Sequence, residues 1–287
     1  MKVLMIGATG KYASYVLPEL KQRGATIRAL VRDETKADAV RQQGADEIAV
    51  GNLDDAPSLR AAADGVDSVF HVNPAFAPNE AELGVAMVEA AKASGVRKFV
   101  FSGVYHPSIS KLSNHAAKRP VEEAMYESGM EFTVLQPSMF MQNFAAGWEA
   151  LVQQGRFSLP YSKLAKACYV DYRDVATVAA MALTGDELSY GTFELCAPGM
   201  VNRVDLAVMM SEAIGRTIEA GESPFDEWAR VAHIPDELRE NLRVMYQDYD
   251  QYGFPGGNAI VLRTLLGREP RSLPQYFQEL AAHKATK

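Results

Sequence analysis

The segment that decides the fold is Gly7–Ala13, which reads GATGKYA and directly follows a short apolar run, Lys2–Ile6. The next stretch, Lys11–Arg23, has the apolar spacing of a helix and stops at Gly24. A glycine-rich turn between a strand and a helix lets backbone N–H groups reach a pyrophosphate at the positive end of the helix dipole. This context favours a dinucleotide site over a plain strand-to-helix turn. The expected contacts are Gly7, Ala8, Thr9, Gly10, Lys11 and Tyr12.

Strand-like and helix-like segments continue to alternate through the first half of the chain. Further strands are expected at Thr26–Val31, Ile48–Val50, Ser68–Val72, Phe99–Ser102 and Phe132–Leu135. Helices are expected between them at Glu34–Gln43, Pro57–Ala63, Glu80–Ala93 and Ser113–Ser128. This alternation predicts a parallel sheet with helices on both faces, and right-handed crossovers make it a doubly wound α/β fold of the Rossmann type.

The second half of the chain changes character. A helix is expected at Asp174–Leu183 and a strand at Thr192–Leu195, and from Val204 onward the pattern is mostly helical with prolines as breakers. We therefore expect an NAD(P)-binding Rossmann core formed by residues 1–140, to which residues 171–197 return. Residues 141–170 and 198–287 are expected to form a smaller, mainly helical C-terminal lobe that binds a substrate or a partner.

The composition excludes several classes of protein. The chain has 287 residues, of which 48% are apolar and 23% are charged, an ordinary balance for a globular protein. Its net charge of −7 disfavours direct binding to nucleic acid. Its apolar runs are too short for a membrane span or a secretory signal. Cys168 and Cys196 suit neither a disulfide framework nor a metal site, so we expect a cytoplasmic protein without metal and without membrane contact.

The end of the second expected strand discriminates between the two nicotinamide cofactors. An NAD site has an acidic residue there for the ribose hydroxyls, but this chain has Val31 followed by Arg32. A guanidinium can bind the 2′-phosphate of NADP in a planar, bidentate manner, and Lys11 and Lys36 add positive charge. Asp33 lies one residue beyond the position from which an acidic side chain would bind the ribose hydroxyls. The sequence therefore predicts NADP(H), with a solvated surface charge as the competing interpretation of Arg32.

Six further stretches together resemble one known family. They are ALVRD at 29–33, GNLDD at 51–55, FVFSGVYHPS at 99–108, LSNHAAKRPVEEAMYESGMEFTVLQPSMFMQNF at 112–144, VDYRDVATVAAMAL at 170–183 and LLGREPRSLPQYFQELA at 265–281. With GATGKYA they resemble the NmrA-like family of atypical short-chain dehydrogenases/reductases over nearly the whole chain. That family contains NADPH-dependent reductases of quinones and dyes, and also regulators that bind nucleotide.

The resemblance implies a set of cofactor contacts by position. Asn52 and Leu53 are implied beside the adenine, and Asn73 and Pro74 near the nicotinamide ribose. The nicotinamide itself is implied to contact Ser102 and Gly103, with Pro137, Ser138, Phe140 and Asn143 as the far wall of its pocket. Strand-end caps and turn residues are the competing interpretation of these positions.

The chain departs from the superfamily at its catalytic tyrosine. Ordinary members carry Tyr-x-x-x-Lys, and here the lysine matches at Lys118 while Asn114 occupies the tyrosine position. An amide cannot exchange a proton near neutral pH. Lys118 is expected to orient the cofactor at the nicotinamide ribose, unless it is a solvated helix charge. Tyr105 and His115 are the candidates for a replacement acid, with an aromatic wall and a helix-start histidine as the competing interpretations.

The missing tyrosine has a chemical consequence. Hydride transfer to a plain ketone leaves an alkoxide, whereas a quinone leaves a phenolate-like oxygen whose pKa is about 10. The sequence therefore favours a reductase of a small apolar or aromatic, conjugated molecule. The apolar stretch from Phe140 to Trp148 either lines a flat pocket or is the buried side of one helix. An NADP(H)-sensing regulator that acts through a protein partner is the alternative function, and a homodimer stays open.

Overall fold

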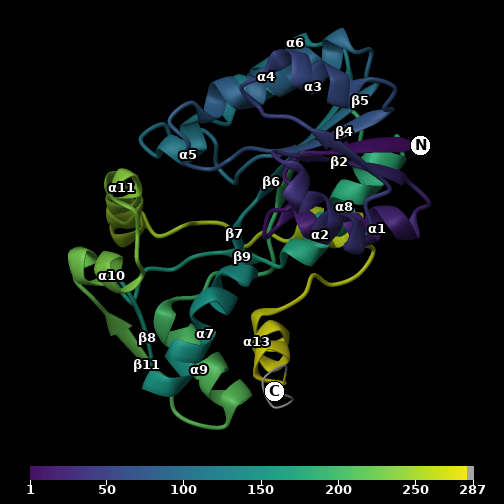
Figure 1. The fold of residues 1–287 in the computed structure, drawn as a ribbon. Helices are drawn as coiled ribbons and strands as arrows, with labels where there is room; N and C mark the ends of the chain where they lie inside the picture. Colours follow the sequence, from purple (N-terminus) through teal and green to yellow (C-terminus); the bar gives the residue numbers. More distant parts are fainter. Residues whose placement is uncertain (283–287) are drawn as a thin grey trace. The chain divides into compact units, whose positions relative to one another are not determined.

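The computed structural model describes residues 1–282, and these divide into two compact units (Figure 1). The first unit contains Met1–Pro137 and Tyr172–Glu194, and the second contains Ser138–Asp171 and Leu195–Lys287. The chain therefore leaves the first unit after Pro137, returns at Tyr172 and leaves again after Glu194.

The first unit is built on a seven-stranded sheet with the order β10-β6-β5-β4-β1-β2-β3. All five pairings among β1 to β6 are parallel. The strands are β1 (Lys2–Met5), β2 (Thr26–Val31), β3 (Glu47–Val50), β4 (Ser68–Val72), β5 (Lys98–Ser102), β6 (Glu131–Pro137) and β10 (Gly191–Leu195). The order reverses between β1 and β4, which is the switch point where open α/β sheets bind ligands.

Helices cover both faces of this sheet, as the alternating pattern predicts (Figure 1). One layer contains α3 (Ala56–Ala63), α4 (Glu80–Ala93) and α6 (Arg119–Glu127), which pack against one another in that order. The other face carries α1 (Val16–Gln22) and α8 (Tyr172–Thr184), which pack together, and α8 also contacts β4, β5 and β6. The doubly wound Rossmann fold is thus confirmed.

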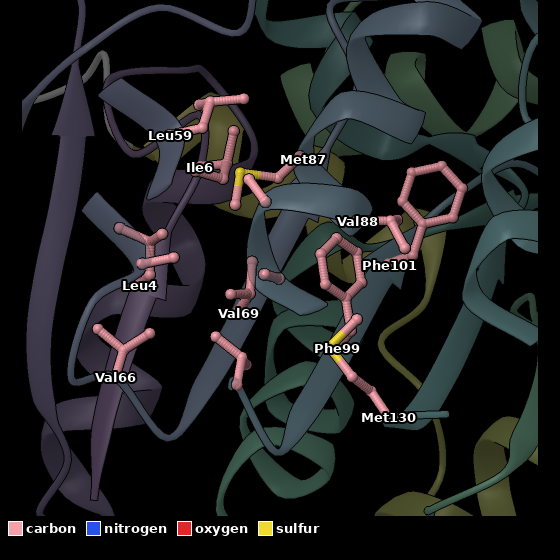
Figure 2. Close-up of a cluster of buried hydrophobic side chains, with 14 of the residues drawn as sticks. Leu4, Ile6, Leu59, Val66, Val69, Met87, Val88, Phe99, Phe101 and Met130 are labelled. Carbon is pink, nitrogen blue, oxygen red and sulfur yellow. The ribbon is translucent and has the colours of Figure 1, made fainter. Parts of the chain in front are cut away.

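The core between the sheet and the first helix layer is continuous and apolar. Figure 2 shows strand residues such as Leu4, Val69 and Phe99 facing Met87 and Val88 from α4. All five are fully buried. A parallel sheet that is covered on both faces needs apolar side chains on both sides of its strands, which explains why these strands read as near-continuous apolar runs.

Three expected helices differ from the pattern, two at their starts and one by being divided. The helix after the glycine-rich turn opens as a short 3₁₀ segment, η1 (Ala13–Tyr15), and α1 begins only at Val16. The helix expected over Ser113–Ser128 is divided into α5 (Ser113–Ala116) and α6. Pro120 sits in the first turn of α6, where its missing N–H costs nothing; further inside one continuous helix it would break the hydrogen-bond ladder. In the segment after β2, η2 (Glu34–Lys36) precedes α2 (Ala37–Gln42).

The second unit is mainly helical, as expected, but it also contains two small sheets. Its helical segments are η3 (Met141–Gly147), α7 (Trp148–Gln154), α9 (Arg203–Ile214), α10 (Phe225–Val231), α11 (Asp236–Tyr252), α12 (Ile260–Leu266) and α13 (Leu273–Ala282). The unexpected strand pairs are β7 (Met139–Phe140) with β9 (Tyr169–Val170), and β8 (Arg156–Leu159) with β11 (Glu219–Glu222). Each strand has four residues or fewer, and its partner is distant in sequence, so local apolar alternation does not reveal it. Within residues 1–282, no helix combines the length and apolarity that spanning a bilayer requires.

Gly84, on α4, lies where the packing leaves no space for a side chain. A Cβ here would lie 2.6 Å from Asn73 Oδ1 and closer still to Val121 Cγ2. We expect Gly84→Ala to lower the free energy of unfolding by about 1–3 kcal/mol, because a packed core has no room for the added methyl group. Denaturant unfolding measures this loss. Gly147→Ala is the matched control, since nothing lies within 4 Å of its added Cβ; equal stability of the two variants would contradict the expectation.

Candidate functional site

The turn after β1 is a backbone cradle that only small residues can form. Gly7 has a φ of +77°, and a Cβ on it would lie 2.8 Å from Val72 Cγ1. The N–H of Gly10 donates to the carbonyl oxygen of Gly7 at 2.7 Å, and a Cβ on Gly10 would lie 2.9 Å from that same oxygen. Both glycines are therefore required by close approach, and the turn brings its backbone to the surface.

Three amides of this turn lack an acceptor within residues 1–282; Thr9 and Lys11 are exposed, whereas Ala8 is fully buried. In the part of the chain that the structure describes, the backbone N–H groups of Ala8, Thr9 and Lys11 have no hydrogen-bond acceptor. Lys11 is exposed, and its Nζ lies 5.3 Å from the centroid of the Tyr12 ring. Successive free amides in a turn beside a cation form an anion-binding concavity, so the residues present fit a bound pyrophosphate.

The end of β2 carries exposed positive charge. Arg32 is exposed and forms no hydrogen bond or ion pair within residues 1–282, and Lys36 is exposed at the end of η2. Asp33 caps η2, because its carboxylate accepts from the N–H of Thr35 at 3.0 Å. The hydroxyl of Thr35 also holds the pKa of Asp33 below its usual value, and the charges of Lys36 and Arg32 help to lower it. Asp33, which follows the position of the ribose-binding acid by one residue, is thus engaged by Thr35. The side chains of Arg32 and Lys36 are exposed to solvent.

The end of β3 contributes a third turn at the same edge of the sheet. The N–H of Asn52 donates to Ser58 Oγ at 3.1 Å, which closes the turn before α3. Asn52 is exposed, and Leu53 is half-buried. Because the carboxyl ends of parallel strands lie along one edge, the turns after β1, β2 and β3 border the same side of the switch point.

The side chain of Asn73, at the end of β4, is occupied within the protein. Asn73 Oδ1 lies 2.6 Å from His71 Nε2, and its Nδ2 donates to the carbonyl oxygen of Glu80 at 3.1 Å. Asn73 is buried, whereas Pro74 beside it is exposed. Both polar atoms of the Asn73 side chain therefore have partners within the protein, as in a residue that caps the end of a strand.

Lys118 is not a solvated helix charge. Its ammonium donates to Glu80 Oε1, and both residues are buried, with 5% and 3% of their surface exposed. Glu80 Oε2 in turn accepts from the N–H of Phe76 at 2.7 Å. Burial lowers the pKa of Lys118 to about 8, while the adjacent carboxylate favours the charged ammonium. Sequence reasoning missed this partner, because an acidic residue in the first turn of a helix is ordinarily explained by the helix dipole.

A buried hydrogen bond ties the end of β5 to α8. Ser102 Oγ lies 3.2 Å from the hydroxyl of Tyr172, and the N–H of Gly103 donates to the carbonyl oxygen of Leu135 at 2.8 Å. Burial raises the pKa of Tyr172 to about 12, so its phenol stays protonated. The Tyr172 ring lies 5.5 Å from that of Tyr12, which connects the end of β5 with the glycine-rich turn.

The two candidate acids lie in the segment between β5 and α6. Tyr105 is buried, its N–H donates to Pro137 O at 3.0 Å, and its ring centroid is 4.1 Å from that of His106. His115 is buried, with Nδ1 3.0 Å from the carbonyl oxygen of His106. This contact fits the interpretation of His115 as a helix-start residue. Asn114 has a buried Oδ1 without a hydrogen-bond partner in residues 1–282.

A buried acid that sequence reasoning missed lies behind this segment. Glu122, on α6, accepts from Gln136 Nε2 at 3.0 Å, and burial raises its pKa. No charged side chain among residues 1–282 is paired with it. The sequence signal was present but weak, since Glu122 follows Lys118 by one helical turn.

Three of the implied contacts belong to the second unit. Ser138 is buried, and its N–H donates to Leu195 O at 3.0 Å; Phe140 ends β7, and Asn143 is exposed in η3. The apolar stretch behind them is core. Phe144 and Trp148 are buried, and their rings lie 5.1 and 5.8 Å from that of Phe277. Their burial supports the buried side of a helix as the interpretation of Phe144 and Trp148, although Trp148 also lines a cavity together with Val152 and Ala213.

Comparisons with known proteins agree with this architecture. The model of the NmrA-like family matches residues 1–280. The chain is 32% identical to an NAD(P)H azoreductase from Xenophilus azovorans, over 98% of each chain. It is 25% identical to quinone oxidoreductase 2 of Escherichia coli, over 97% of this chain and 98% of that one.

Solved structures share the fold along the whole chain. The triphenylmethane reductase of Citrobacter sp. superposes with a TM-score of 0.88 at 21% identity, covering 98% of this chain and 100% of that one. The quinone oxidoreductase of Escherichia coli, complexed with NADPH, superposes with a TM-score of 0.84 at 22% identity, covering 99% of each.

The neutral state of His71 makes stability depend on pH. His71 is fully buried against Phe101, and burial lowers its pKa to about 4, whereas an unfolded histidine titrates near about 6.5. The unfolded chain therefore binds one more proton between these values. We expect the free energy of unfolding to fall by about 3 kcal/mol as the pH drops through this window, as measured by urea unfolding.

The matched variants separate His71 from the other histidines. His71→Gln should remove this part of the pH dependence. His233→Asn should retain it, because His233 is exposed and asparagine tolerates its φ of +53°. The same pH slope in wild type and in His71→Gln would show that another group is responsible.

Proposed function

The chain belongs to the NmrA-like family, and we propose that it is an NADP(H)-dependent reductase that transfers hydride to a quinone-like or other conjugated apolar molecule. The observation that carries this proposal is the turn Gly7–Tyr12, whose glycines leave backbone amides open to a phosphate. Relatives named as azo and quinone reductases support the same type of activity. A small apolar or aromatic molecule is the proposed substrate.

The proposed cofactor contacts follow the strand ends of the first unit. The turn after β1 binds the pyrophosphate through its amides, and Arg32 and Lys36 bind the 2′-phosphate as cations. Asn52 and Leu53 line the adenine. Pro74, Ser102 and Gly103 border the nicotinamide side, where Lys118 orients the ribose. The roles of Pro137, Ser138, Phe140 and Asn143 stay predictions.

The residues of the chain suit an acceptor that needs little acid catalysis. The bound cofactor supplies a hydride, which carries two electrons and one proton. A quinone takes this hydride and one further proton to give the hydroquinone, while NADPH becomes NADP⁺. The amide of Asn114 cannot transfer a proton near neutral pH, but a phenolate-like oxygen with a pKa of about 10 is protonated by the solvent at that pH. Positioning of the two reactants then supplies most of the rate enhancement.

The regulatory alternative is the weaker of the two functions. The named reductases among the relatives favour turnover over sensing. A homodimer, a regulatory protein partner and a cytoplasmic location stay predictions.

The free guanidinium of Arg32 predicts a cofactor preference. We expect NADPH to bind at least about tenfold more tightly than NADH, since a charge-assisted hydrogen bond contributes about 1.5–3 kcal/mol. Fluorescence titration at a fixed salt concentration measures both affinities. Arg32→Ala should weaken NADPH and leave NADH nearly unchanged. Equal affinities of the wild type for NADPH and NADH would contradict the proposed binding of the 2′-phosphate by Arg32.

Turnover against a panel of acceptors tests the function itself. The wild type should oxidise NADPH with quinones or conjugated dyes and leave simple aliphatic ketones untouched, because Asn114 replaces the tyrosine that ordinarily protonates an alkoxide. Gly10→Val should remain folded by circular dichroism and lose both binding and turnover, because its side chain fills the cradle. Tight NADPH binding without turnover of any acceptor would reject the reductase in favour of the sensor.

A further inference from the structure

We propose that Glu80 is a positioning residue for the reaction, which holds the ammonium of Lys118 and the loop after β4 in the arrangement that the nicotinamide end of the cofactor requires. The inference rests on the proposed function and assigns a role to a residue outside every expected contact. Its basis is a buried carboxylate whose two oxygens bind two different elements.

The first oxygen of Glu80 fixes the lysine. Glu80 opens α4, and Lys118 immediately precedes α6, so the ion pair joins the amino ends of two neighbouring helices. Only 5% of Lys118 and 3% of Glu80 is exposed. A long lysine side chain in such a pair loses the freedom to choose other rotamers, and breaking the pair would leave a buried charge without a partner.

The second oxygen of Glu80 fixes the loop. The amide of Phe76 donates to it at 2.7 Å, and Phe76 has a φ of +66°, a conformation that costs free energy for a bulky residue. Asn73 closes the same loop through the carbonyl oxygen of Glu80. This loop follows β4, which lies beside β1 at the switch point. Glu80 therefore stabilises a strained wall of the nucleotide crevice opposite the glycine-rich turn.

Glu80 is also the anion that opposes the effect of burial on the charge of Lys118. The titratable groups that interact with this ammonium are Glu80 from α4, which forms the ion pair, and His71 from β4. On its own segment, His115 and Glu122 are joined to Lys118 by backbone hydrogen bonds, three residues before it and four after it. His71 is neutral above about pH 5, because its pKa is about 4. Burial raises the pKa of Glu122, whose carboxylate is bound by the neutral amide of Gln136. Removing the carboxylate of Glu80 thus leaves burial of Lys118 uncompensated.

The test compares pH profiles of Glu80→Gln and the wild type. Glutamine keeps the size and one acceptor oxygen but removes the charge. We expect the affinity for NADPH and kcat/KM to decline with rising pH at a midpoint at least about one unit lower in the variant. NMR of the lysine ε-methylene groups, with the Lys118 signal assigned by its loss in Lys118→Met, should show the same shift without any cofactor. Glu82→Gln, an exposed site on the same helix, should match the wild type.

Three outcomes would overturn the proposal. They are an unshifted Lys118 titration, an equal loss of activity at every pH, and a Glu80→Gln variant with the wild-type profile. If Glu80→Gln does not fold, the double variant Glu80→Leu/Lys118→Met replaces the buried pair by apolar residues, which is tolerated in other proteins. It should bind NADPH weakly and without this pH dependence, and a retained dependence would contradict the role of Glu80. If the Lys118 titration shifts between the wild type and Glu80→Gln, but the wild type neither binds nor oxidises NADPH, the proposed function is rejected and the role of Glu80 toward Lys118 is not.

Discussion

The close approach of the first turn to β4 is the constraint on which the rest of the structure depends. Gly7 adopts a left-handed backbone directly against Val72, where any side chain would collide. That contact lets the chain turn sharply at the switch point, directs the following amides outward and starts the first helix as a 3₁₀ turn. This turn lies between the charge at the end of β2 and the buried network at the end of β4, and the proposed function depends on that arrangement.

The sequence predicts the elements whose signal is local. The bounds of β2, β4 and α4 agree with the expected ranges to the residue, because apolar runs and helical spacing there end at clear turn residues. The strand pairs β7–β9 and β8–β11 were not predicted from the sequence, because each strand is stabilised by a partner that is distant in the chain.

The residues of the candidate site also differ in whether their signal in the sequence is local or depends on long-range packing. The glycines of the turn and Arg32 are visible in the sequence because their proposed roles depend on strand-to-helix position alone. The pairing of Glu80 with Lys118 and of Ser102 with Tyr172 depends on packing across 38 and 70 residues. No propensity or spacing rule reports such a contact, and for this reason the engaged side chain of Asn73 and the buried acid Glu122 also became evident only in three dimensions.

The interleaving of the two units constrains how the protein can fold during synthesis. The first sheet is covered on one face by α8 and bordered by β10, and both follow Ser138–Asp171 of the second unit in the chain. An emerging polypeptide that ends near Pro137 therefore exposes the apolar face over β4, β5 and β6. Contacts of such long sequence separation slow folding and prolong the exposure of apolar surface. Neither unit is a contiguous segment, so a truncated first unit would be prone to aggregation.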